Sequence, residues 1–236
     1  MLGSLNALLA ATVAFVGGHF LLSSAPLRIP LAKALGPGGF TPVYALLVGA
    51  AFLWMLAAYA AAPAVAVWYP PPALRWVPLL VMPFALILAV AGLTAPNPTA
   101  VGGEKVVARA AGTPHTLVGG IFTVTRHPFL WGATLWAVSH LLVNGTAADM
   151  ILMGGVLVLS LGGMRHIDRR REAALGADWG PIRMTTSLVP FAAIVEGRTK
   201  FDWRGIGWWR PVVALLLYGA LLHFHQFIFG VPALPS

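Results

Sequence analysis

Cysteine is absent from this chain of 236 residues, and charged residues are scarce. Without cysteine the protein has no disulfide, no thiolate nucleophile, no covalent c-type haem attachment and no Cys metal site. Any metal or haem ligand must therefore come from His, Met, Tyr or carboxylate side chains. Charged residues make up 9% of the chain, whereas a soluble domain carries roughly 25%. This shortage excludes an ordinary soluble fold.

Apolar residues take the place of the missing charges. They make up 58% of the chain, and the mean hydropathy is +0.82. The apolar runs are continuous and lack the alternation of a transmembrane strand, so helices fit them better than a barrel. We predict a single domain over residues 1–236, an all-α, polytopic integral membrane protein with about six transmembrane helices. The runs are Leu5 to Leu22, Val43 to Ala62, Leu74 to Thr94, Phe129 to Val143, Ala147 to Met164 and Val212 to Val231.

The basic residues predict how the chain is oriented. Of the 15 Lys and Arg residues, 14 fall in the first, third and fifth loops, and only Arg75 lies beside the second. The positive-inside rule then places these three loops in the cytoplasm and both termini, N and C, outside. Topology and anionic lipid thus account for the net charge of +8, so we do not expect nucleic acid as a partner. The lipid bilayer is the partner that the sequence predicts.

Three of the seven histidines, His19, His140 and His166, lie in or against apolar runs. An ionisable side chain in hydrocarbon is costly and is a functional candidate by default. At a rise of 1.5 Å per residue, a helix carries His140 about 20 Å from His127 and turns it to a different face. We therefore predict two layers of imidazoles. The inner layer holds His19, His127 and His166, and the outer layer holds His140 with either His223 or His225.

Each histidine also has a purely structural interpretation. His19 follows two glycines and can hydrogen-bond a neighbouring helix where the backbones approach closely. His127 sits at a helix start, where it can serve as a cap, and His166 lies beside charged residues that suit a solvated ion pair. His223 and His225 suit the membrane interface, and His115 falls in a loop.

Five motifs stand out along the chain. They are Gly-Gly-His-Phe-Leu-Leu-Ser-Ser at 17–24, Thr-Ala-Pro-Asn-Pro-Thr at 94–99, Thr-Arg-His-Pro-Phe-Leu-Trp-Gly at 125–132, Ser-His-Leu-Leu-Val-Asn-Gly at 139–145 and Gly-Gly-Met-Arg-His-Ile-Asp-Arg-Arg-Arg at 162–171. Together they resemble the NnrU family of bacterial membrane proteins. The resemblance spans nearly the whole chain and implies a protein of the bacterial inner (cytoplasmic) membrane, associated with denitrification and nitric oxide metabolism. The family's plant and cyanobacterial relative is ζ-carotene isomerase, so the resemblance also implies haem b as cofactor and a polyene or other small molecule as substrate.

Matched by motif, the resemblance implies His19 and His140 as the metal ligands that hold the haem iron. The chain departs from the isomerase at Ala137, where that enzyme has a cysteine implicated in ligand switching. The predicted vertical offset between the two layers conflicts with this ligand pair. Either the helix after His127 is tilted or broken, or the ligands are another set, such as His19 with His127 or His166.

A second resemblance favours a different chemistry. Arg126-His127-Pro128, followed by Glu172 and Trp179, is similar to a divergent isoprenylcysteine or phospholipid methyltransferase pattern. It implies S-adenosylmethionine bound at the inner layer, with Arg126 or Arg169 facing an anion. A third alternative is an accessory membrane protein without chemistry of its own. The sequence does not specify the oligomeric state.

Overall fold

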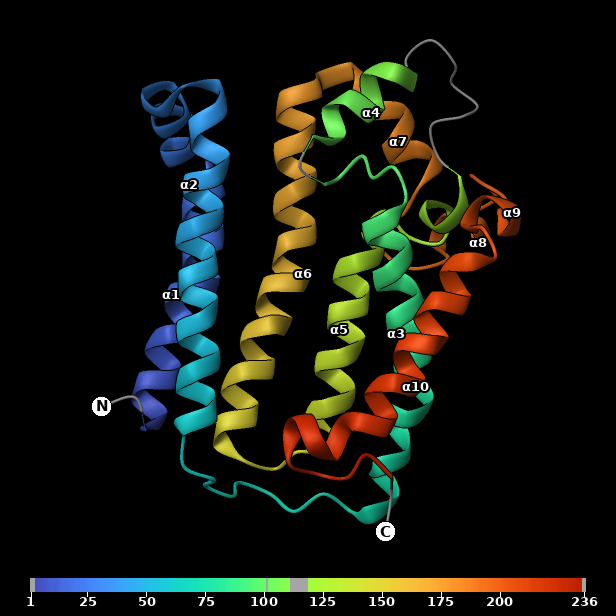
Figure 1. The fold of residues 1–236 in the computed structure, drawn as a ribbon. Coiled ribbons are helices and arrows are strands. Elements are labelled where there is room, and N and C mark those ends of the chain that lie inside the picture. Colours follow the sequence, from blue (N-terminus) through green and yellow to red (C-terminus); the bar gives the residue numbers. More distant parts are fainter. Residues whose placement is uncertain (1–2, 101, 111–118, 235–236) are drawn as a thin grey trace.

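The computed structural model describes residues 3–100, 102–110 and 119–234. Long helices run side by side in it, and both ends of the chain lie at the same end of the bundle (Figure 1). Five helical stretches are long and apolar enough to cross a membrane, which confirms the prediction of an all-α, multi-pass membrane protein. They are Leu5–Ser23, Gly38–Ala61, Pro72–Thr94, Ala147–Thr185 and Trp209–Phe229.

These stretches belong to five long helices, and a sixth, shorter helix runs beside them. The sixth, α5 (Pro128–Leu141), has 14 residues and is about 21 Å long, short of the roughly 30 Å hydrocarbon core. The five others are α1 (Leu5–Ser23), α2 (Ala25–Ala61), α3 (Trp76–Thr94), α6 (Ala147–Leu175) and α10 (Trp209–Phe229).

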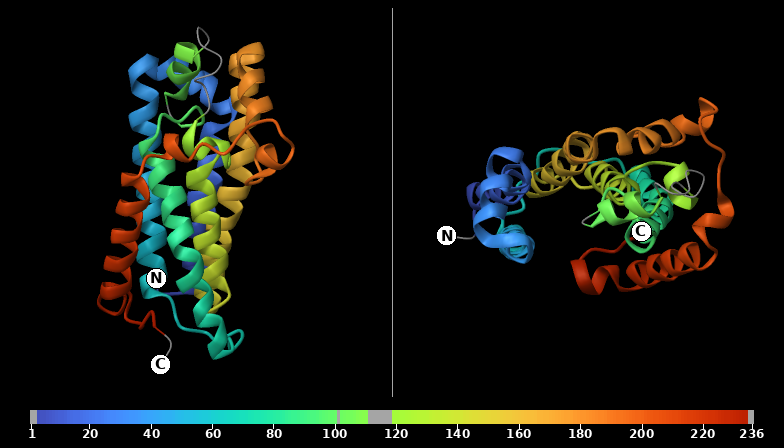
Figure 2. Two further views of the ribbon diagram at one scale, coloured as in Figure 1. Left: turned by 90° about the vertical axis from the view of Figure 1, so that its right-hand side faces the viewer. Right: turned by 90° about the horizontal axis from the view of Figure 1, so that it is seen from above.

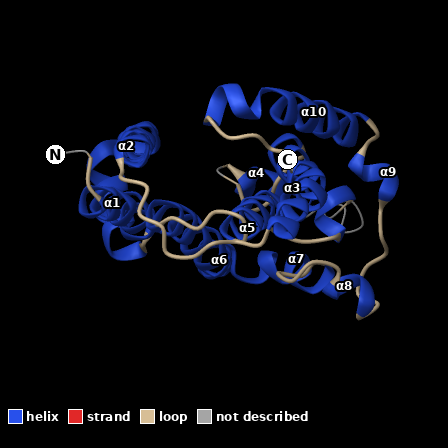
Figure 3. Cartoon of the chain, turned by 90° about the horizontal axis from the view of Figure 1, so that it is seen from below, coloured by secondary structure: helices blue, strands red, loops and turns tan. Residues whose placement is uncertain are grey.

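The six helices form an open row rather than a closed bundle. The packed pairs are α2 with α1, α1 with α6, α6 with α5, α5 with α3, and α3 with α10. The row is curved when seen along the helices, with α2 and α10 at its two ends (Figure 3). Two perpendicular views show the same row from the side and from above (Figure 2).

Glycines allow the helices of this row to pack closely. A Cβ atom at Gly132 of α5 would lie 2.6 Å from the backbone oxygen of Ala85 in α3, and one at Gly155 of α6 would lie 2.3 Å from Thr12 of α1. Small residues at such contacts are typical of membrane helices, where association depends on packing rather than on the hydrophobic effect.

Turn chemistry connects α5 to α6 as a helical hairpin. The Asn144-Gly145 turn leads to Thr146, which caps α6 by accepting a hydrogen bond from the backbone N–H of Asp149 at 3.2 Å. Gly145 lies against the segment before α3, and its carbonyl accepts a 2.7 Å hydrogen bond from the N–H of Val67. The hairpin therefore fixes where α5 ends and α6 begins.

Short elements gather at the end of the bundle where α1 ends and α5 begins, which we call the inner end; the opposite end is the outer end. α2 has a non-helical residue there, Gly36, with φ of +76°. The Arg-rich part of α6 also reaches the inner end and continues into the 3₁₀ helix η4 (Figure 1). The short elements are α4 (Gly103–Ala110), η3 (Gly120–Thr123), η4 (Gly176–Trp179), α7 (Gly180–Thr185), α8 (Ala192–Val195) and α9 (Trp203–Ile206), and η1 (Pro72–Arg75) precedes α3 at the outer end.

Candidate functional site

The loop that enters α5 holds Arg126 and His127 in fixed positions. The N–H of Arg126 donates to the carbonyl of Ser187 at 2.8 Å, and the Thr125 hydroxyl donates to the carbonyl of Leu188 at 3.0 Å. Pro128 then starts the helix, a position that tolerates proline because its missing N–H needs no partner there. The Arg-His-Pro motif is therefore a rigid junction between a loop and a membrane helix.

Asp168 of α6 receives both side chains of this motif. One carboxylate oxygen lies 2.8 Å from Nε2 of His127, and the other lies 2.9 Å from the guanidinium of Arg126. The two basic side chains are 1% and 7% exposed, and that of Asp168 is 19% exposed. Burial lowers the pKa of Arg126 from its ordinary value, and the charge of Asp168 opposes this effect. The ion pair with Arg126 thus holds the carboxylate of Asp168 beside His127, where it orients the imidazole.

The other nitrogen of His127, Nδ1, is buried and has no hydrogen-bond partner among the described residues. A carboxylate only accepts hydrogen bonds, so its contact with Nε2 places a proton on that nitrogen. In the tautomer with this proton on Nε2, Nδ1 carries a lone pair. A buried acceptor without a partner is costly, which is typical of a functional site rather than of a core.

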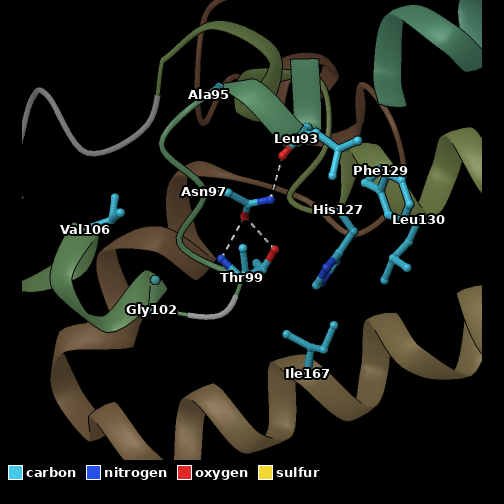
Figure 4. A pocket seen from close by; sticks show the side chains of 13 residues that line it. Leu93, Ala95, Asn97, Thr99, Gly102, Val106, His127, Phe129, Leu130 and Ile167 are labelled. Carbon is cyan, nitrogen blue, oxygen red and sulfur yellow. Dashed lines mark hydrogen bonds between the residues drawn. The ribbon is translucent and has the colours of Figure 1, made fainter. Parts of the chain in front are cut away.

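His127 lines a cavity of about 380 Å³ at the inner end, between α3, α4, α5 and α6. Figure 4 shows its ring between Thr99 and Ile167. The cavity opens at the surface of the helix row, because two side chains that line it are exposed: Leu93 is 69% exposed and Phe129 is 42% exposed. The side chain of His127 itself is buried beneath this opening and is 1% exposed.

A tight turn after α3 shapes one wall of this cavity. The side-chain oxygen of Asn97 accepts hydrogen bonds from the N–H and the hydroxyl of Thr99 at 2.8 and 2.7 Å (Figure 4). Its amide donates to the carbonyl of Gly92 at 3.1 Å. Glycine is needed at 92, because a Cβ atom there would lie 2.6 Å from the backbone N of Phe129. Two motifs distant in sequence, residues 94–99 and 125–132, thus build one cavity.

His166 and His19 lie on the other side of α6, toward α1. Nε2 of His166 is 2.9 Å from the hydroxyl of Ser23, which also donates to the carbonyl of His19. Nδ1 of His19 is 3.2 Å from the carbonyl of Phe15, and its ring meets Tyr44 of α2 edge-on. These two histidines are close to one another but face away from the cavity of His127.

His140 lies at the outer end of α5, one residue before the helix ends. Its Nδ1 is 2.8 Å from the carbonyl of Trp136 and 3.3 Å from the hydroxyl of Ser139. Because α5 is one unbroken helix, His140 is about 20 Å from His127 along its axis. His19 is near the opposite end, so the structure does not bring His19 and His140 into one site.

Two charged side chains of α6 bind partners on other elements. Asp168 and Arg171, spaced as a pair on one helix face, do not pair with each other: Asp168 binds Arg126 and His127, and Arg171 binds Glu104 of α4. His127 and Asp168 are 41 residues apart, so no local sequence pattern links them, and the sequence analysis did not predict their contact. Within the described part of the chain, no group of three or more His, Cys, Asp or Glu side chains could hold a metal ion. His115 lies outside the described residues.

The fold and this site define a class: a polytopic helical membrane protein with a buried histidine–carboxylate pair in a cavity at one end of its helices. Within that class the chain belongs to the NnrU family, since the family model described as "NnrU protein" matches residues 7–233. No solved structure matches the chain.

Two curated relatives carry the name 15-cis-ζ-carotene isomerase, chloroplastic. The protein from Arabidopsis thaliana is 37% identical over 84 residues, and the one from Zea mays is 34% identical over 86 residues. Each match covers 36% of this chain. The chain spans about a quarter of the length of these relatives, 23% and 24%. Similarity to the isomerases therefore supports a related role but does not define the reaction.

Proposed function

We propose that the protein is a haem-dependent, ζ-carotene isomerase-like enzyme of the bacterial cytoplasmic membrane that changes the cis–trans geometry of a polyene. The single observation that carries this proposal is the similarity to two proteins named 15-cis-ζ-carotene isomerase within a matched family. A polyene is apolar and dissolves in the bilayer, and two apolar side chains at the opening of the cavity, Leu93 and Phe129, are exposed at the surface of the helix row.

The cavity of His127 supports this proposal through its shape and polarity. Its walls include Leu93, Phe129, Leu130 and Ile167, which suit an apolar chain. Its one buried imidazole is oriented by Asp168 and can accept a hydrogen bond or a proton through Nδ1. In this role Asp168 is a positioning residue, and its second carboxylate oxygen is held by Arg126. The substrate thus meets mainly apolar walls, with the polar side chains of Asn97, Thr99 and His127 among them.

His140 is the residue that best fits a haem. Its Nδ1 donates to a backbone carbonyl, which leaves Nε2 with a free lone pair, the usual arrangement of a metal-bound histidine. His19 has the same arrangement at the inner end, so each of them fits alone, but they lie too far apart to share one iron here. When bound at His140, haem would supply a redox-active iron at the outer end, about 20 Å from the cavity of His127.

The test begins with protein purified in mild detergent from haem-replete cells. We expect a Soret band that His140→Ala abolishes, and conversion of 15-cis-ζ-carotene to another geometric isomer, followed by chromatography under oxidising and reducing conditions. His127→Asn should keep the Soret band and lose at least tenfold in turnover. Arg204→Gln, an exposed residue of α9 outside the cavity, is the control. A colourless protein that leaves the polyene unchanged overturns the proposal.

Methyl transfer is a second candidate, supported by one observation: the cavity lies at the inner end and contains the histidine of the Arg-His-Pro motif. In that case purified protein binds S-adenosylmethionine in calorimetry, stays colourless, and loses binding in His127→Asn.

The same preparation tests the family's association with nitric oxide, since a haem open to this gas shifts its Soret band on titration. An accessory protein would bind neither S-adenosylmethionine nor haem and would co-purify with other proteins.

A further inference from the structure

The cavity of His127 contains a polar atom that a hydrocarbon cannot satisfy. Nδ1 of His127 is buried and has no hydrogen-bond partner among the described residues, and the side chain is 1% exposed. Figure 4 shows its ring in the cavity, between Thr99 and Ile167. A polyene without polar groups would cover this atom and leave it unpaired, which costs free energy in a buried site. The cavity therefore suits a ligand that offers Nδ1 a hydrogen-bond partner.

The charges around His127 favour an acceptor at Nδ1. One oxygen of the Asp168 carboxylate is paired with the guanidinium of Arg126 at 2.9 Å, and the other lies 2.8 Å from Nε2 of His127. A protonated His127 would place two positive side chains against this one carboxylate, and a buried charge without a full partner is costly. The neutral ring keeps its proton on Nε2, so Nδ1 presents a lone pair to the cavity.

Thr99 provides a second acceptor on the cavity wall. Its hydroxyl donates its hydrogen to the side-chain oxygen of Asn97 at 2.7 Å, so the oxygen of Thr99 can meet a ligand only as an acceptor. The amide of Asn97 holds this turn in place by donating to the carbonyl of Gly92 at 3.1 Å. A ligand that donates a hydrogen bond is therefore the one that this polar part of the wall accommodates.

The rest of the lining selects a neutral and mainly apolar ligand. Leu130 and Ile167 line the cavity, and Leu93 and Phe129 are exposed at its opening. None of the lining residues that the structure describes is Asp, Glu, Lys or Arg. A charged head group would lose its hydration without gaining an opposite charge from these residues. A hydroxyl group on an apolar chain supplies the donor without a charge.

We infer that the polyene taken by the His127 cavity is an alcohol, whose hydroxyl group donates a hydrogen bond to Nδ1 of His127. This inference rests on the proposed function and narrows its substrate from polyenes in general to hydroxylated ones. The conjugated chain lies against the apolar walls, and the hydroxyl group lies at the inner end, where the arginines of α6 indicate the membrane surface. The hydrocarbon ζ-carotene makes no such hydrogen bond and binds less tightly.

The experiment measures the binding of all-trans-retinol and of its methyl ether to the full-length protein in mild detergent. The two probes share one conjugated chain, and only the hydroxyl hydrogen of retinol is replaced by a methyl group in the ether. Energy transfer from tryptophan to the bound polyene gives both dissociation constants, with empty micelles as background. Wild type should bind retinol about tenfold more tightly, because the ether leaves Nδ1 unpaired. Equal binding of the two probes overturns the inference.

Two variants of His127 separate hydrogen bonding from fit. His127→Gln keeps an N–H for Asp168 near the position of Nε2 but has no acceptor at the position of Nδ1. Its preference for retinol should therefore fall below about threefold. His127→Asn can place its amide oxygen where Nδ1 lies, so it should keep most of the preference. A preference that persists unchanged in His127→Gln would show that the methyl group of the ether is excluded by size, and the inference is wrong.

The control variant is Arg204→Gln on α9, which should bind both probes as wild type does. The Soret band and the conversion of 15-cis-ζ-carotene are measured on the same preparations. If these are present and wild type binds both probes equally, the inference is wrong but the proposed function stands. If wild type prefers retinol but binds no haem and leaves the carotene unchanged, the proposed function fails and the alcohol site is supported.

Discussion

Asp168 is the residue on which the inner site depends. Its carboxylate binds two buried basic side chains, Arg126 and His127, and the guanidinium of Arg126 is always charged. Removing the charge of Asp168 would leave Arg126 without its ion-pair partner. Breaking a buried ion pair costs more than an exposed one, because the remaining charge stays desolvated. The same residue orients His127, so stability and chemistry at this site share one carboxylate.

We expect Asp168→Asn to lower the free energy of unfolding by about 3 kcal/mol. Glu172→Gln is the matched control: it lies four residues further along α6, and its ion pair with Arg183 is exposed, with side chains 54% and 62% accessible. That change should cost less than about 1 kcal/mol. Thermal unfolding in detergent, followed by tryptophan fluorescence, measures both. Equal losses in the two variants would contradict the central role of Asp168.

Glu104 predicts a pH dependence. Burial alone would raise its pKa, but a hydrogen bond from its own backbone N–H and the charge of the buried Arg171 outweigh this, so the pKa is lowered from the ordinary value. A lowered pKa in the folded state adds stability above the ordinary carboxyl pKa, about 4.3, and that stability is lost as pH falls through the folded value. Wild type should therefore lose more stability than Glu104→Gln between about pH 5 and 3.

Melting temperatures measured across this pH range test the expectation. Half of the Glu104 side chain is exposed, at 51%, so solvent screening keeps the effect small. Parallel pH curves for the two proteins would show that the pairing with Arg171 contributes nothing to stability.

At the scale of helices, the fold depends on where glycine lets two helices touch. Gly132 of α5 faces Ala85 of α3, and any side chain there meets backbone rather than a flexible group. The α3–α5 contact also forms a wall of the cavity that holds His127. Spacing between these two helices therefore sets the width of the site.

Gly132→Ala should destabilise the protein by about 1–3 kcal/mol, since overpacking forces the helices apart. Gly154→Ala on α6 is the control, because a Cβ atom there meets nothing within 4 Å. It should be neutral or stabilising by up to about 1 kcal/mol. Unfolding midpoints of the two variants give the comparison. A destabilised Gly154→Ala with an unaffected Gly132→Ala would reverse the expected order.

At the scale of the whole molecule, the open row has an inner end rich in arginine and an outer end where the chain begins and finishes (Figure 1). α6 carries Arg165, Arg169, Arg170 and Arg171 to the inner end. These charges are typical of a cytoplasmic face, where anionic lipid attracts them. The cavity of His127 would then face the cytoplasm, and His140 with His225 the opposite side.

Reporter fusions test this orientation. Alkaline phosphatase, active only outside the cytoplasm, should be active when fused after Ser236 and inactive when fused after Thr199, in the basic loop between α6 and α10. A fluorescent reporter that folds only in the cytoplasm should give the opposite result. If the phosphatase fused after Thr199 is active, the predicted orientation is wrong, and the inner end lies outside the cytoplasm.

The sequence by itself determined the membrane helices, the hairpin at Asn144-Gly145 and the two layers of histidines. These features follow from local properties: runs of apolar residues, turn residues and the fixed rise of a helix. Only the tertiary structure decided that Asp168 binds Arg126 and His127, and that Arg171 binds Glu104. Such pairings depend on which helices become neighbours and how each is rotated, and packing between distant segments settles both.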